Sequence, residues 1–189
     1  METLTAVALG LGLAAAAGFR VFVPLLAAGL AARTGQVHLA AGFDWLATTP
    51  ALISLGLATL IEIVAYYVPW LDHVLDTVAT PGAVVAGIVS SAAVVTDLPP
   101  AVTWLVAIIG GGGLAGIVQG ATVLARVKST ALTGGLGNPV ISTAESLGAT
   151  GTVLLALLIP TVTLLLLAAG CLLIFRASGR LLFGRRHAS

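Results

Sequence analysis

Three long, mainly apolar runs constrain this chain more than any other feature of its sequence. They cover Ala47 to Val68, Ala101 to Ala125 and Thr152 to Phe175, and Pro, Gly or charged residues bound each of them. A hydrocarbon core of about 30 Å is crossed by roughly 20 helical residues, so each run is long enough to span a bilayer. The runs therefore predict membrane-spanning helices.

The composition agrees with a chain that is embedded in a lipid bilayer. Of its 189 residues, 59% are hydrophobic and 8% are charged, whereas about 25% of the residues of a soluble domain are charged. No soluble fold of this length can hide so many apolar side chains, so much of the surface must face lipid. A formal net charge of +1, without basic stretches interleaved with aromatic residues, argues against a nucleic-acid partner.

Two further apolar stretches are short, and they predict interruptions. Thr3 to Ala17 is too short for a full crossing, yet its continuation to Ala32 would be too long for one. We therefore expect a break or a strong kink at Gly18 to Pro24. The second stretch, Pro81 to Val95, is expected to begin a helix at its proline. That helix is expected to cross a thin part of the bilayer, to cross it with a tilt, or to enter it only part way.

A polar stretch at Ala131 to Gly148 reads ALTGGLGNPVISTAESLG. Its glycines and its proline disfavour a continuous helix, and Asn138 is suited to cap a helix that starts at Pro139. From that start, Ser142 and Glu145 fall near one helix face. Two interpretations stay open. One is a half-helix whose amino end points into a sheltered cavity, as in transporters; the other is a surface loop with a capped helix start.

Two ionisable residues within the predicted membrane zone are candidate functional groups. Glu62 lies inside the first apolar run, where a carboxylate is costly unless it faces protein or water. Arg20 lies in the expected break. Its guanidinium could pair with Glu62 or Glu145, hold an anionic group, or extend to an interface.

An acidic pair follows the first apolar run. Asp72 and Asp76 are four residues apart, so on a helix both carboxylates would project from one face and could hold a divalent cation or a proton. A solvated loop and helix start is the alternative interpretation of this pair. No other cofactor is indicated by the sequence.

Basic residues predict the orientation. By the positive-inside tendency, the basic tail at residues 176–189 should be cytoplasmic. Arg126 and Lys128 favour the same side, which requires one crossing between Lys128 and Thr152. The interrupted stretch at 131–148 is the candidate for that crossing.

Small and aromatic residues follow helical patterns. Two sets of small residues recur every four positions and predict faces for close helix packing, within the chain or between copies in a homo-oligomer. Aromatic residues near predicted helix ends indicate headgroup levels. The small-residue sets are Gly112, Gly116 and Gly120, and Gly10, Ala14 and Gly18; the aromatic residues are Trp45, Trp70, Trp104, Tyr66 and Tyr67.

Three motifs together resemble an uncharacterised bacterial integral-membrane family known as domain of unknown function 4126. They are GFRVFVPLL at Gly18 to Leu26, GNPVISTAES at Gly137 to Ser146, and the series Glu62, Ala65, Pro69, Asp72 and Asp76. The sequence departs from the pattern at Tyr66 and Tyr67, where a charged pair is more usual. The resemblance implies a compact polytopic protein of the bacterial inner membrane and no particular activity.

We expect an all-α polytopic membrane protein, one integral membrane domain over residues 1–189, with about five or six membrane segments, some of them broken or re-entrant. The expected function is a small transporter or channel for an ion, a proton or a small anionic solute. Alternatives are an intramembrane enzyme that acts on a lipid-linked phosphate, with Asp72 and Asp76 holding a metal, and a membrane scaffold or assembly protein. The expected path residues are Arg20, Glu62, Asn138, Ser142 and Glu145; no catalytic residue is predicted.

Overall fold

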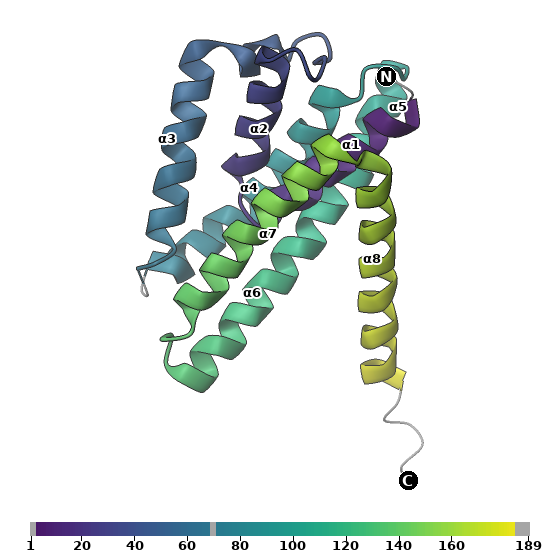
Figure 1. The fold of residues 1–189 in the computed structure, drawn as a ribbon. Coiled ribbons are helices and arrows are strands. Elements are labelled where there is room, and N and C mark those ends of the chain that lie inside the picture. The colour runs from purple at the N-terminus through teal and green to yellow at the C-terminus, as the bar shows by residue number, and fades with distance from the viewer. Residues whose placement is uncertain (1–2, 69–70, 184–189) are drawn as a thin grey trace.

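A computed structural model describes residues 3–68 and 71–183 of the chain, except for the side chains at positions 72, 73, 174, 175 and 177–183. Within those ranges all regular structure is helical, as the sequence predicts (Figure 1). The chain is a polytopic helical membrane protein. Its elements are α1 (Thr3–Ala17), α2 (Phe22–Arg33), η1 (Asp44–Ala47), α3 (Thr49–Ala65), α4 (Leu71–Val94), α5 (Pro100–Leu105), η2 (Val106–Gly112), α6 (Gly113–Thr133), α7 (Asn138–Leu158) and α8 (Pro160–Phe183).

The first two helices form a re-entrant pair. In Figure 1 the start of α1 and the end of α2 both lie near the upper end of the molecule, and the break between them lies near mid-height. The two helices have 15 and 12 residues, fewer than the roughly 20 that a crossing needs. The break expected at Gly18 to Pro24 is confirmed at residues 18–21, and it carries Arg20 into the protein interior, where that residue is 1% exposed.

Three helical stretches of the described chain are long and apolar enough to cross a membrane. The longest combines α5, the π-helical segment η2 and α6 into one continuous stretch, which includes the predicted run at Ala101 to Ala125. The predicted run at Ala47 to Val68 forms the shorter helix α3. The three stretches are Val74–Val94, Pro100–Thr133 and Asn138–Leu158.

The expectation that a short helix begins at Pro81 is wrong. Pro81 lies inside α4, which starts at Leu71. A proline forgoes one backbone hydrogen bond of its helix, but membrane helices tolerate this because neighbouring helices and side chains satisfy the freed groups. The segment therefore has the length of a full crossing.

Within the interrupted stretch at 131–148, residues 134–137 form the turn of a helical hairpin, which lies at the lower end of the molecule in Figure 1, and residues 138–148 belong to the crossing helix α7. α6 ends at Thr133, and Gly134 and Gly135 follow with φ angles of 62° and 90°, a conformation that favours glycine. α7 begins at Asn138, close to the predicted start. Asn138 was expected to cap it, but the capping position is Gly137 and no side-chain cap bond forms there.

The predicted continuous run at Thr152 to Phe175 is wrong, because the chain breaks at residue 159. α7 ends at Leu158 and α8 begins at Pro160, with Ile159 at φ −141° and ψ 69° between them. A proline disfavours helical backbone at the residue before it, which explains this break. α8 then runs back toward the lower end of the molecule (Figure 1).

Small residues of α1 let neighbouring helices approach closely. A Cβ atom added at Gly18 would lie 2.6 Å from the carbonyl oxygen of Ala115, and one at Gly12 would lie 2.6 Å from the Cβ of Ala156. The other predicted face is packed only in part. Gly112 is in close contact with Ile88, whereas Gly120 faces open space.

The aromatic residues divide between two environments. Trp45 and Trp104 are about half exposed, at 50% and 47%. Tyr66 was expected near the headgroups, but it is buried, at 3% exposure. Trp70 lies outside the described residues.

Candidate functional site

The break between α1 and α2 places the guanidinium of Arg20 against one face of α7. Its Nη2 donates to the hydroxyl and the backbone oxygen of Ser142, at 2.6 and 2.9 Å, and its Nε donates to the hydroxyl of Ser146 at 3.2 Å. Its Nη1 lies 3.3 Å from Oε2 of Glu145. The three α7 residues share a face because they are three and four positions apart. The predicted pairing of Arg20 with Glu145 is thus present in the structure.

Glu145 is also bound by an arginine of the neighbouring helix α6. Nε of Arg126 donates to Oε1 of Glu145 at 3.0 Å, and its Nη2 donates to Oε2, which makes the contact bidentate. Nη1 of Arg126 lies 3.7 Å from Oδ1 of Asp76 in α4. We name Arg20, Asp76, Arg126 and Glu145 the charge cluster. The α1–α2 break and helices α4, α6 and α7 each contribute one of its members.

The ring of Tyr66, just after α3, contacts both arginines of the charge cluster. The guanidinium carbon of Arg20 lies 4.4 Å from the ring centroid, and that of Arg126 lies 3.9 Å from it. Cations at such distances are attracted to the face of an aromatic ring. The tyrosine therefore fixes the end of α3 against both arginines, at a position where a charged residue had been expected on the family pattern.

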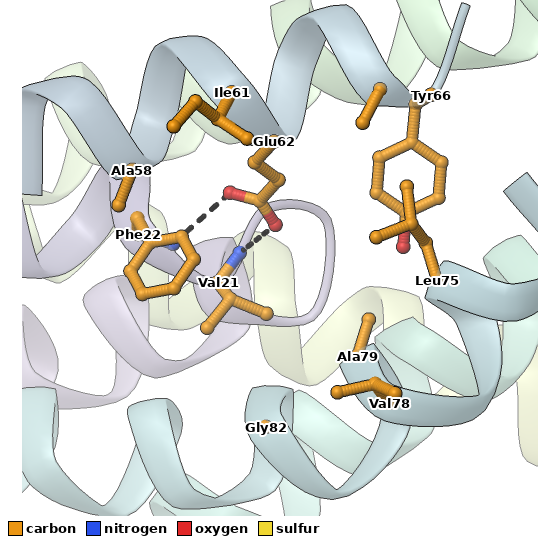
Figure 2. Close-up of a pocket in the computed structure, with 11 residues that line it drawn as sticks. Val21, Phe22, Ala58, Ile61, Glu62, Tyr66, Leu75, Val78, Ala79 and Gly82 are labelled. Atoms are coloured by element: carbon orange, nitrogen blue, oxygen red, sulfur yellow. Dashed lines mark hydrogen bonds between the residues drawn. The ribbon is translucent and has the colours of Figure 1, made fainter. Parts of the chain in front are cut away.

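Glu62 accepts hydrogen bonds from the backbone at the amino end of α2. Its Oε1 accepts from the backbone N–H of Val21 at 2.7 Å and its Oε2 accepts from that of Phe22 at 3.2 Å (Figure 2). The first N–H groups of a helix have no partner within the helix, and they carry partial positive charge. The Glu62 carboxylate, on α3, thus pairs with the otherwise unbonded N–H groups at the start of α2. That start lies inside the protein, next to Arg20.

Asn138 lies apart from the charge cluster, at the start of α7. Its Nδ2 donates to the hydroxyl of Thr130 in α6 at 3.0 Å, and it is 1% exposed. It stands seven positions before Glu145, or about 10 Å along the helix. The contact ties together the two arms of the α6–α7 hairpin.

The predicted metal pair is described only in part. The side chain of Asp72 lies outside the described residues, and Asp76 contacts Arg126 in the charge cluster. No group of three or more His, Cys, Asp and Glu side chains within the described residues is placed to hold a metal ion. The metal site at Asp72 and Asp76 stays a prediction.

Two apolar pockets border the buried polar groups. One, of about 380 Å³, lies between α3, α4 and the start of α2, and Glu62 and Tyr66 are part of its lining (Figure 2). The other, of about 450 Å³, lies between α6 and α7 and is lined in part by Phe19, Thr122 and Glu145. The second pocket therefore reaches the charge cluster at Glu145, whereas the first reaches Glu62 and Tyr66 beside the cluster.

Sequence reasoning missed Arg126 as a site residue. It was assigned to the cytoplasmic surface, but the structure buries it at 2% exposure, while Lys128 is exposed. A signal was present in the spacing. Arg126 stands eight residues before Gly134, and Glu145 stands eight residues after Gly137, so a hairpin that turns at these glycines brings the two side chains to the same level.

A family model described as a domain of unknown function, DUF4126, matches residues 7–180 of the chain. That range includes the break, the charge cluster, Glu62 and the hairpin. No curated protein and no solved structure shows a significant match to the chain.

Proposed function

We propose that this chain, which belongs to the DUF4126 family of unknown function, is a small membrane transporter or channel that moves a cation or a proton past the charge cluster. The observation that carries the proposal is the burial of two guanidiniums and the Glu145 carboxylate inside an apolar helical bundle, with the half-buried carboxylate of Asp76 beside them, so that four separate segments contribute. In a membrane, ionisable groups that face the bundle interior mark ion and substrate paths.

A purely structural role accounts poorly for the charge cluster. Replacement of a buried ion pair by packed apolar side chains is often neutral or stabilising, so stability alone does not favour such a network. The network is also loosely bonded at two atoms, because Nη1 of Arg20 and Nη1 of Arg126 are buried and make ion-pair contacts with Glu145 and Asp76 but no well-formed hydrogen bond. Networks that only rigidify a core satisfy their donors more fully. Two loosely bonded guanidinium groups therefore fit a polar path between the helices better than a rigid structural network.

The sign of the charge favours a cation or a proton over an anion. The charge cluster and Glu62 together hold two guanidiniums and three carboxylates among the described side chains. With every carboxyl ionised their formal charge is negative by one, and a low-dielectric interior favours neutralising that excess with a proton or a cation. A positive ion would balance it.

Beyond the charge cluster, α4 packs closely against η2 and α6. Along α4, Gly87 lies between Asp76 in the charge cluster and Val95, which lines a pocket near η1 and α5. A Cβ atom at Gly87 would lie 2.6 Å from the Cβ of Ala115 and 2.9 Å from the carbonyl oxygen of Gly111. Passage would require α4 to separate from η2 and α6, a movement of packed helices that transporters commonly use.

We place the protein in the bacterial inner membrane with its carboxyl end in the cytoplasm. α6 and α8 both run toward the lower end of the molecule in Figure 1, so Lys128, late in α6, and Arg176, late in α8, lie toward the same side. Basic residues favour the cytoplasmic side.

Two other functions rank below transport. An enzyme acting on a lipid-linked phosphate would need a metal at Asp72 and Asp76, and the contact of Asp76 with Arg126 favours an ion pair instead. A scaffold would need free packing faces, and Gly12, Gly18 and Gly112 are used in contacts within the chain, whereas Gly120 faces open space. A metal requirement would favour the enzyme, and altered assembly without any change of flux would favour the scaffold.

A flux screen in proteoliposomes tests the proposal. It compares protons, small cations and small anions in the wild type, Glu145→Gln and empty liposomes, with Asp97→Asn as a matched control because Asp97 is exposed in the loop after α4. We expect wild-type flux of protons or of a cation, loss of most of it in Glu145→Gln, and no change in Asp97→Asn. Wild-type flux equal to that of empty liposomes for every solute would overturn the proposal.

A further inference from the structure

We propose that the pocket between α3 and α4 binds a lipophilic organic cation from the bilayer, with the carboxylate of Glu62 as its counter-charge. This inference rests on the proposed transport function and names the class of its substrate. It is drawn from the shape, lining, opening and charge of the pocket.

The lining of the pocket suits an apolar body. Among the eleven lining residues that the structure describes, only Glu62 and Tyr66 have polar side chains; the other nine are Val21, Phe22, Ala58, Ile61, Ala65, Leu75, Val78, Ala79 and Gly82. Its volume of about 380 Å³ falls within the range of about 300–1,000 Å³ that is typical of small-molecule sites.

The pocket opens at the side of the bundle rather than at an end. Ile61 of α3 and Val78 of α4 lie at its edge and are 67% and 68% exposed. Large apolar side chains so exposed on membrane helices face the lipid tails. A ligand that dissolves in the bilayer can therefore reach the pocket without crossing water.

Among the described lining residues, Glu62 alone carries a charge, and no cationic side chain that the structure describes pairs with it. Its two oxygens accept only the backbone N–H groups of Val21 and Phe22, and among the described residues no Lys or Arg nitrogen forms an ion pair with it. Glu145, by contrast, is bonded by Arg126 and paired with Arg20. Because an ionised carboxylate offers about four acceptor sites, Glu62 keeps capacity for a cation.

The chemistry of the pocket selects against a bare metal ion. Hard cations need about six or more oxygen ligands or retained water, and one carboxylate in an apolar lining does not supply them. An organic cation with delocalised or shielded charge needs one counter-charge and apolar contacts. The ring of Phe22 borders the same space as the carboxylate in Figure 2 and offers an aromatic face to such a cation.

A proton and the cation would compete for the same carboxylate. When the cation binds to protonated Glu62, the carboxyl releases its proton and the resulting carboxylate pairs with the cation. When the cation leaves, a proton takes its place. One proton is thereby exchanged for each cation, which couples the movement of one to the gradient of the other.

Binding of tetraphenylphosphonium to the full-length protein in lipid nanodiscs tests this site, with empty nanodiscs as the baseline. We expect saturable binding by the wild type, release of about one proton per bound cation in weak buffer, and affinity weaker by about tenfold or more in Glu62→Gln. Asp97→Asn, which removes an exposed carboxylate, should bind as the wild type does.

A second variant keeps the test independent of Glu62. Ala79→Leu fills the pocket and leaves the carboxylate in place, so it should also weaken binding, whereas Ala101→Leu, on the exposed side of α5, should not. Absence of saturable wild-type binding, or equal binding by the wild type and both pocket variants, overturns the inference.

The outcomes of the binding test and of the flux screen distinguish a failure of this inference from a failure of the transport proposal. Flux of protons or small cations without tetraphenylphosphonium binding would overturn this inference and leave the transport function standing. Binding that depends on Glu62 and Ala79, without flux of any solute, would support the site and overturn transport.

Discussion

Each arginine of the charge cluster is held by residues of other helices and not by its own. Arg20 contacts α7, and Arg126 contacts α7 and α4. A buried charge that loses its partner costs far more than the pair itself contributes, because the remaining charge stays desolvated. At the scale of residues, the cluster should therefore be sensitive to any substitution that removes one charge.

Arg126→Gln should destabilise the protein by about 3–5 kcal/mol, because Glu145 then loses its bidentate partner in the interior. Equilibrium unfolding in mixed detergent micelles measures the change. The matched control is Arg33→Gln, since Arg33 is exposed and donates one bond to Thr49 at 2.8 Å. It should cost no more than about 1.5 kcal/mol. Equal losses in the two variants would contradict the assigned role of Arg126.

Two substitutions of Tyr66 separate the contribution of its ring to stability from that of its hydroxyl. Tyr66→Phe keeps a ring face for Arg20 and Arg126 and should unfold within about 1 kcal/mol of the wild type, whereas Tyr66→Leu should lose about 2 kcal/mol or more. The same unfolding measurement compares them. If the phenylalanine and leucine variants were equally unstable, the ring contacts would not stabilise the cluster.

Part of the site could be predicted from single residues. The pairing of Arg20 with Glu145, and the shared face of Ser142 and Glu145, follow from a break at Gly18 and from helical spacing. The backbone bonds of Glu62 could not be predicted, because they depend on how α3 lies against the start of α2. Arg126 was misassigned because a basic residue near a helix end looks the same whether it faces water or a buried carboxylate.

At the scale of elements, glycine and proline positions predicted some breaks and misled on others. Gly18 ends α1, and the glycines at 134 and 135 turn the hairpin, as local backbone preferences indicate. Pro81 and Pro160 illustrate the difficulty. The first is tolerated inside α4 and the second starts α8, and the difference depends on neighbouring helices and not on the local sequence.

The contact of α4 with η2 and α6 depends on Gly87. Gly87→Ala should destabilise the protein by about 1–3 kcal/mol, because its Cβ would meet Ala115 and Gly111. Gly120→Ala, in α6 with nothing within 4 Å of the added atom, should be neutral or stabilising by up to about 1 kcal/mol. Thermal unfolding in detergent compares the two. A Gly87→Ala variant as stable as the wild type would contradict the close contact.

At the scale of the whole molecule, the helical membrane fold followed from hydrophobicity and length, but the arrangement of the helices did not. Lipid tails are as apolar as leucine side chains, so a face that contacts lipid and a face that contacts another helix carry the same signal. The position of α1, with almost every residue after Ala8 buried, is an example. The re-entrant pair became evident only with the neighbours of α1 in place.

The topology predicts which loops share a side of the membrane. In a Cys171→Ala background, Leu136→Cys in the α6–α7 hairpin should react with an impermeant thiol reagent from the cytoplasm, and Asp97→Cys should react from outside. Both positions are exposed, Leu136 at 83%. Labelling of the two positions from the same side would contradict the topology, and labelling of Leu136→Cys from outside would reverse the orientation.

Access of a small cation to the centre of the bundle tests the account most directly. In the Cys171→Ala background, Ser142→Cys and Ala149→Cys compare two fully buried positions of α7, the first against Arg20 and the second in the apolar core. A small cationic thiol reagent added to native membranes should modify Ser142→Cys and leave Ala149→Cys unmodified, because only the charge cluster lies on the proposed path. If Ser142→Cys is as unreactive as Ala149→Cys, the cluster is a closed structural network and the path does not exist.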